Sequence, residues 1–123
     1  MFTSTRRETA AYRGASGGYY GFTVFALDEA LPRAAGIYAL VSPDLGPERW
    51  KILLLGETAN FAAELGDSGS LSIREARRRG ATHILLHVSP IATAKRREAG
   101  YDLWRTLRPP LVGWDDEGVL RRA

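Results

Sequence analysis

Clustered arginines are the side chains of this chain with the clearest chemistry. Arg74, Arg77 and Arg78 are spaced i, i+3 and i+4, so on a helix they share one face. A second predicted helix carries Lys95-Arg96-Arg97, which occupies most of one turn. Gathered cations of this kind bind polyanions, because each phosphate contact releases a condensed counterion. The alternative interpretation is that both sets are solvated outer faces of helices.

The distribution of charge along the chain also points to these two predicted helices as a binding surface. The chain of 123 residues has a net charge of +3. Residues 70–108 hold nine basic and three acidic side chains, a net of +6, whereas residues 1–69 and 109–123 have nets of -2 and -1. Nearly all the excess positive charge therefore lies on the two predicted helices, which we expect to bind DNA or RNA.

The sequence gives little support for a metal site or a catalytic centre. The absence of cysteine excludes disulfides, thiol catalysis and cysteine-based zinc sites. His83 and His87 have the same parity on a predicted strand and point to one face, but no third metal ligand accompanies them. We therefore predict no metal site. No glycine-rich phosphate loop or Ser-His-Asp arrangement is present.

Two short motifs carry a resemblance to a known family. Gly36-Ile37-Tyr38 and Leu54-Leu55-Gly56 resemble the signature of the GIY-YIG nucleases. The resemblance covers roughly residues 20–112, and Gly56-Glu57-Thr58 and Gly80-Ala81-Thr82-His83 are similar to motifs of small bacterial members with an extra N-terminal strand. It implies an α+β fold in which a small, mostly antiparallel sheet is flanked by helices.

The resemblance also implies which positions would carry nuclease chemistry. In that family a tyrosine helps to activate water, an arginine steadies the scissile phosphate and a glutamate holds one divalent metal ion. Only the first tyrosine is retained, so we regard it as vestigial, and the other positions are substituted. The residues at these positions are Tyr38, then Leu54 for the second tyrosine, Glu64 for the arginine, Ser68 for a histidine, Gly100 for the glutamate and Val112 for an asparagine.

These substitutions predict loss of catalysis. Phosphodiester hydrolysis requires cations that face the developing negative charge. Glu64 would repel the phosphate that an arginine should bind, and Gly100 removes a metal ligand. Glu98 is no direct substitute, because it lies about 200° around the helix from position 100.

Hydrophobic patterning predicts four strands, over residues 19–27, 36–42, 50–56 and 83–88. We expect the second and third to form a hairpin. The continuous apolar run of the third is typical of a central strand covered on both faces.

Capping signals predict three helices. The first covers residues 60–65, and the second begins with the capping box Ser72-Ile73-Arg74-Glu75 and ends at Gly80. The third begins at Ser89-Pro90 and continues until Pro109.

We expect one domain over residues 19–112, between a polar N-terminal tail of residues 1–18 and a C-terminal tail of residues 113–123. No apolar run approaches the roughly 18 residues of a membrane span, and the N-terminus lacks a signal peptide. These features predict a cytoplasmic protein without a membrane partner.

The sequence hypothesis is a GIY-YIG-like domain that has lost nuclease activity and acts as a nucleic-acid-binding or interaction module. One alternative is a divergent endonuclease that uses Mg²⁺ or Mn²⁺ with Glu57 or Glu98 as a ligand. Another is a protein-interaction domain that binds no nucleic acid. Only the endonuclease alternative requires a cofactor.

Overall fold

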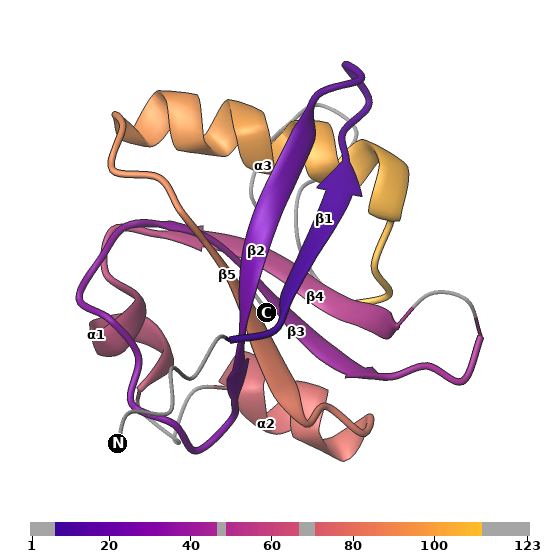
Figure 1. Ribbon diagram of the computed structural model, residues 1–123. Coiled ribbons are helices and arrows are strands. Elements are labelled where there is room, and N and C mark those ends of the chain that lie inside the picture. Colours follow the sequence, from indigo (N-terminus) through magenta and orange to yellow (C-terminus); the bar gives the residue numbers. More distant parts are fainter. Residues whose placement is uncertain (1–6, 47–48, 67–70, 112–123) are drawn as a thin grey trace, which may run out of the picture.

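The chain folds around one curled antiparallel sheet (Figure 1). The computed structural model describes residues 7–46, 49–66 and 71–111. In these ranges the strand order is β1-β2-β5-β3-β4. The strands are β1 (Thr9–Arg13), β2 (Tyr19–Ala26), β3 (Gly36–Pro43), β4 (Trp50–Thr58) and β5 (His83–Val88), and the helices are α1 (Phe61–Leu65), α2 (Leu71–Arg78) and α3 (Thr93–Leu107).

Helices cover both faces of the sheet. Successive strand residues point to opposite faces. Tyr38 and Leu40 of β3 pack in one core cluster with residues of α1 and α2. Ile37 and Ala39 pack in the other cluster, with Leu103 of α3. Figure 1 shows α3 at the top of the view and α2 at the bottom, with the sheet between them. The predicted α+β fold class is therefore confirmed.

Several local predictions are confirmed as well. The second and third predicted strands form the β3–β4 hairpin, in which Tyr38 lies opposite Gly56. The helix α1 begins after Asn60, whose side chain accepts a hydrogen bond from the Ala63 amide at 3.3 Å. Gly80, at φ +98°, ends α2 in the left-handed conformation that glycine adopts without strain.

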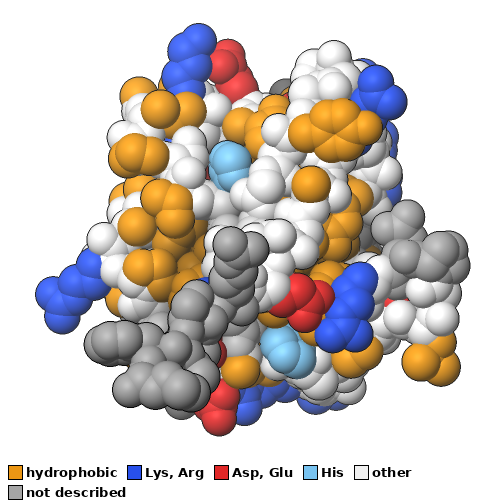
Figure 2. Space-filling model, viewed as in Figure 1, with side chains coloured by type: hydrophobic (Ala, Val, Ile, Leu, Met, Phe, Trp, Pro, Cys, Tyr) orange, Lys and Arg blue, Asp and Glu red, His pale blue; other side chains and the backbone are white. Residues whose placement is uncertain are grey.

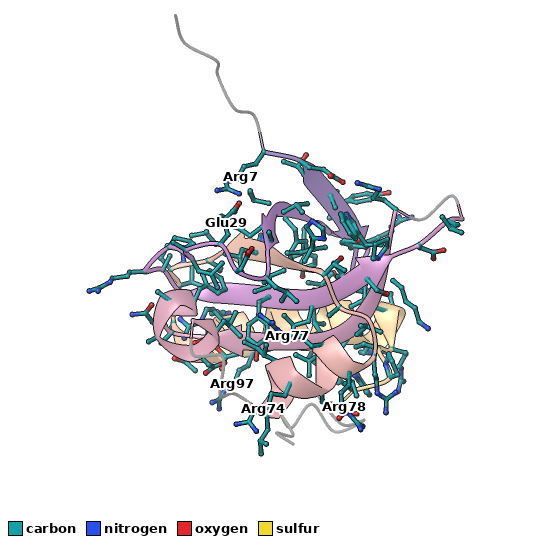
Figure 3. The ribbon with its side chains drawn as sticks, turned by 90° about the horizontal axis from the view of Figure 1, so that it is seen from below. Arg7, Glu29, Arg74, Arg77, Arg78 and Arg97 are labelled. Atoms are coloured by element: carbon teal, nitrogen blue, oxygen red, sulfur yellow. The ribbon has the colours of Figure 1, made fainter. Side chains whose placement is uncertain are left out.

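The N-terminal prediction is wrong for residues 9–13, which form β1 instead of part of a tail. They pair with β2 along their whole length. Arg7 anchors the approach to this strand, since it forms an ion pair with Glu29 (Figure 3) and places its guanidinium 4.0 Å from the centre of the Phe25 ring. This edge strand is mostly polar and small because one of its faces remains exposed, so it lacks the usual apolar signal.

The run at residues 50–56 belongs to an edge strand, not to a central one, because β4 is last in the sheet order. It is apolar because helices cover both of its faces. Leu54 joins the α1 and α2 cluster, and Leu55 joins the α3 cluster. The chain also returns along this strand, where the Leu111 amide donates to the Leu53 carbonyl at 3.0 Å.

Two predicted helix starts are shifted. The helix α3 begins at Thr93, and Ser89 lies in the preceding loop, where its amide donates to the Ala35 carbonyl at 2.8 Å. That tertiary hydrogen bond outweighs the local preference of Ser89-Pro90 for starting a helix. The helix α2 begins at Leu71, one residue before Ser72. The end of α3 before Pro109 agrees with the prediction.

The remaining predictions fall partly outside the described ranges. Ser68, Val112 and the predicted C-terminal tail of residues 113–123 all lie there. Within the ranges that are described, no helix is long and apolar enough to cross a membrane.

Asp102 of α3 fastens the turn between β1 and β2. Its carboxylate accepts hydrogen bonds from the Ser16 amide at 2.7 Å, the Ser16 hydroxyl at 2.8 Å and the Tyr20 hydroxyl at 2.8 Å. Partial burial opposes ionisation of Asp102, but the hydrogen bonds from Ser16 and Tyr20 outweigh it and lower the pKa of the carboxyl. Burial, together with the bond to Asp102, raises the pKa of Tyr20 to about 12.

We predict that Asp102→Asn lowers the free energy of unfolding by about 1 to 3 kcal/mol, because it weakens hydrogen bonds to a charged acceptor. The carboxyl is ionised in the folded protein at pH values where the unfolded chain takes up a proton. Its contribution is therefore full above about pH 4 and is lost as the pH falls through the lowered folded-state pKa. Urea denaturation between about pH 2 and 7 measures both effects.

The control is Glu98→Gln, which changes an exposed carboxylate on the same helix. It should shift the unfolding free energy by no more than about 0.5 kcal/mol. Equal losses of stability in the two variants would contradict the role assigned to Asp102.

Candidate functional site

An open cleft of about 500 Å³ lies where the end of β4 meets the N-terminal ends of α1 and α3. Polar and charged side chains dominate its lining. The cleft is lined by Glu57 and Thr58 of β4, Ala59 and Asn60 of the next turn, Ala63 and Glu64 of α1, and Thr93, Arg96 and Arg97 of α3.

A buried ion cluster forms the floor of this cleft. The Glu57 side chain is only 3% exposed, and its two carboxylate oxygens accept from the Nε atoms of Arg96 and Arg97, each at 3.2 Å. Arg96 is also buried, and its remaining donors bind the Ile91 carbonyl and the Thr93 hydroxyl. Buried charges persist only when they are paired in this way. The cluster thus joins the end of β4 to the start of α3.

This pairing makes Glu57 a poor metal ligand. Both of its oxygens already face guanidinium groups, which a divalent cation would have to displace. Glu98, the other proposed ligand, is 71% exposed and forms an ion pair with Lys95 at 3.7 Å, away from the cleft lining. No group of three His, Cys, Asp or Glu side chains comes together in the part of the chain that the structure describes.

The predicted catalytic positions are only partly gathered. Glu64 lines the cleft, so the position that the resemblance assigns to a phosphate-binding arginine presents a carboxylate there. Tyr38 and Leu54 are buried in the α1 and α2 cluster. A Cβ atom on Gly56 would collide with the Tyr38 ring, so the glycine makes room for that ring. Gly100 is buried within α3 and does not line the cleft.

The predicted basic residues do not form one surface. The helices α2 and α3 belong to different core clusters on opposite faces of the sheet, so their cations are separated. Arg96 is turned inward, which corrects its assignment to a nucleic-acid-binding surface. On the face shown in Figure 2, Lys and Arg side chains are scattered and do not gather in one patch.

The outer surface of α2 retains a compact set of cations, which we call the α2 patch: Arg74, Arg77, Arg78 and Arg79. All four are exposed, and Figure 3 shows Arg74 and Arg78 extending from the helix. Glu75 pairs with Arg78 at 3.0 Å and with Arg79 at 3.2 Å. Hydrogen bonds from these two arginines lower the pKa of Glu75, which therefore stays ionised. Among the described residues, Arg74 and Arg77 form no ion pair.

The two histidines lie in separate aromatic environments. The His83 ring lies 4.7 Å from the Trp50 ring. His87 hydrogen-bonds the Gly21 carbonyl through Nδ1 at 2.8 Å and packs against Tyr20 and Phe22. Each ring therefore has a packing role of its own.

We predict that Glu57→Gln destabilises the protein by about 3 kcal/mol, because it leaves the buried Arg96 without a compensating charge. The control is Glu98→Gln, which removes an exposed carboxylate. Chemical denaturation of both variants measures the difference between their free energies of unfolding. An unfolding midpoint equal to that of the control would show that the cluster does not hold β4 to α3.

Comparison with known proteins adds no further support for the site. No protein family, curated protein or solved structure matches this chain. The candidate site therefore rests on its own geometry: a polar cleft above a neutralised glutamate, and a separate cationic patch on α2.

Proposed function

We propose that this protein is a GIY-YIG-like domain without nuclease activity that binds nucleic acid through the α2 patch. One observation carries the proposal. The helix α2 and the residue directly after it carry four exposed guanidinium groups and a single carboxylate, Glu75, which gives this segment a net charge of +3. Such a density of cations fits the phosphate backbone, whose contacts supply most of non-specific affinity.

The order of the elements supports the family assignment. From Gly36 to Leu107 the chain forms a hairpin, two short helices, a strand and a long helix. This is the order that the resemblance implies. In addition, Tyr38 and Gly56, one residue from each motif, lie opposite each other in the hairpin.

The chemistry of the cleft argues against the endonuclease alternative. Its lining presents Glu64 at the phosphate-binding position, and Glu57 is already neutralised by two arginines. A nuclease that used Mg²⁺ or Mn²⁺ would need a carboxylate that is open to the metal ion. A protein partner with an acidic surface is the other alternative, and the binding experiment below separates it from nucleic acid.

We predict binding to duplex DNA or RNA that tolerates sequence changes and weakens steeply with salt. The log-log slope should be about -0.9 for each duplex phosphate that is neutralised. Replacing Arg74, Arg77 and Arg78 with glutamine should make the slope shallower by up to about three units. Fluorescence anisotropy over a salt titration gives the slope.

The matched control replaces Arg13 and Lys51, exposed cations of the two edge strands, with glutamine. This change should leave the slope unaltered. If no nucleic acid binds at about 50 mM salt, where electrostatic binding is strong, the α2 patch must serve a protein partner instead.

We also predict that the purified protein with Mg²⁺ or Mn²⁺ does not cut supercoiled or branched DNA. The reason is that Gly100 and Glu64 stand at the positions of the metal ligand and the phosphate clamp of the resembled motif. An agarose-gel nicking assay tests this. Metal-dependent nicking that is lost in Tyr38→Phe would establish the endonuclease alternative.

A further inference from the structure

One flank of α3 carries alternating aromatic and cationic side chains. Arg97, Tyr101, Trp104 and Arg105 have the spacing i, i+4, i+7 and i+8, which places them on one side of the helix. Arg108, the left-handed residue directly after α3, places its guanidinium over the Trp104 ring and joins this set. We call this set the α3 ledge. From Arg97 to Arg105 it extends about 12 Å along the helix, at 1.5 Å per residue.

Four members of the α3 ledge, all except Arg97, lie against one another. The rings of Tyr101 and Trp104 are stacked, with centroids 6.1 Å apart and an interplanar angle of 18°. The guanidinium of Arg108 lies 4.2 Å from the centre of the Trp104 ring, and that of Arg105 lies 5.8 Å from the centre of the Tyr101 ring. Planar cations and planar rings therefore form a single stacked row.

The inner side of the α3 ledge takes part in fixing the helix, since Tyr101 and Trp104 are half-buried against the α3 core cluster and Arg97 pairs with Glu57 at 3.2 Å. Leu103 and Gly100 point to the core, and the opposite flank bears Asp102 and Thr106, which bind the β1–β2 hairpin. The charge of Asp102 is engaged with Ser16 and Tyr20. The arginines at positions 105 and 108 are exposed, and the two rings are half-buried. The surface left to a ligand therefore consists of the exposed guanidinium groups of Arg105 and Arg108 and the exposed parts of the two rings beneath them.

We propose that the α3 ledge binds single-stranded nucleic acid by stacking its bases. Unpaired bases stack on aromatic rings and on guanidinium planes, while arginines attract the phosphates. A duplex keeps its bases inside and would use only the charges of the α3 ledge. Because α3 and the α2 patch lie on opposite faces of the sheet, this site does not depend on binding to α2.

The test compares two labelled strands of about 12 nucleotides, a length within the site sizes of single-strand binders. One strand is oligothymidine and the other is abasic, with the same backbone and charge. We expect oligothymidine to bind about 5-fold to 150-fold more tightly for a single stacked base. Trp104→Leu should abolish this ratio, and Trp104→Phe should retain most of it.

The charged side chains are tested with a matched pair of variants. Replacing Arg105 and Arg108 with glutamine should weaken oligothymidine binding, whereas replacing Arg78 and Arg79 should leave the ratio between the two strands unchanged. Equal affinity for the two strands, or no binding to either, overturns the proposal. If Trp104→Leu does not fold, as judged by circular dichroism, the proposal is tested by the affinities of the unaltered protein for the two strands and by the two double arginine variants. Failure of duplex binding by the α2 patch is a separate result, because it is measured with a different ligand and different variants.

Discussion

The strand β3 is buried on both faces, and this constraint determines where the other elements lie. Its residues from Gly36 to Val41 are all buried, because helices cover the sheet on each side. Within the described ranges, two short helices cover one face and one long helix covers the other. The same arrangement separates the basic residues of α2 from those of α3, so the segment with most of the positive charge presents two surfaces.

The buried ion cluster at the end of β4 depends on this arrangement. Glu57 lies one residue after Gly56, where the strand reaches the first turn of α3. A buried ion pair of this kind contributes little net stability, because desolvation costs about as much as pairing returns. The effect of the ion cluster is to position α3. Arg96 and Arg97 fix the rotation of α3, which in turn fixes the direction in which the α3 ledge faces.

Local signals in the sequence were sufficient for much of the fold. The β3–β4 hairpin, the end of α2 at Gly80 and the end of α3 before Pro109 follow from turn formers and helix breakers near each position. The edge position of β4 depends on strand pairing between distant segments, which no local pattern encodes. The strand β1 pairs with its neighbour in sequence, but its small and polar residues give no apolar strand pattern.

The candidate site was predictable to a smaller extent. The shared exposure of Arg74, Arg77 and Arg78 follows from helical spacing. The inward turn of Arg96 does not, because its partner Glu57 is 39 positions away in the sequence. The signal available in the sequence was Glu57 itself, a charged residue at the end of an apolar strand. A buried carboxylate needs a cation as its partner, and only the folded chain shows that this cation is Arg96.

The sheet order has a consequence for synthesis on the ribosome. In the part of the chain that the structure describes, the strand β2 has one neighbour besides β1, namely β5, which ends 62 residues after β2. At about 5 to 20 residues per second, the β1–β2 hairpin waits roughly 3 to 12 seconds for that partner. An isolated two-stranded hairpin is marginally stable at best in water. The growing chain therefore carries an open β2 edge until β5 has emerged, and the turn between β1 and β2 gains its hydrogen bonds to Asp102 only after that.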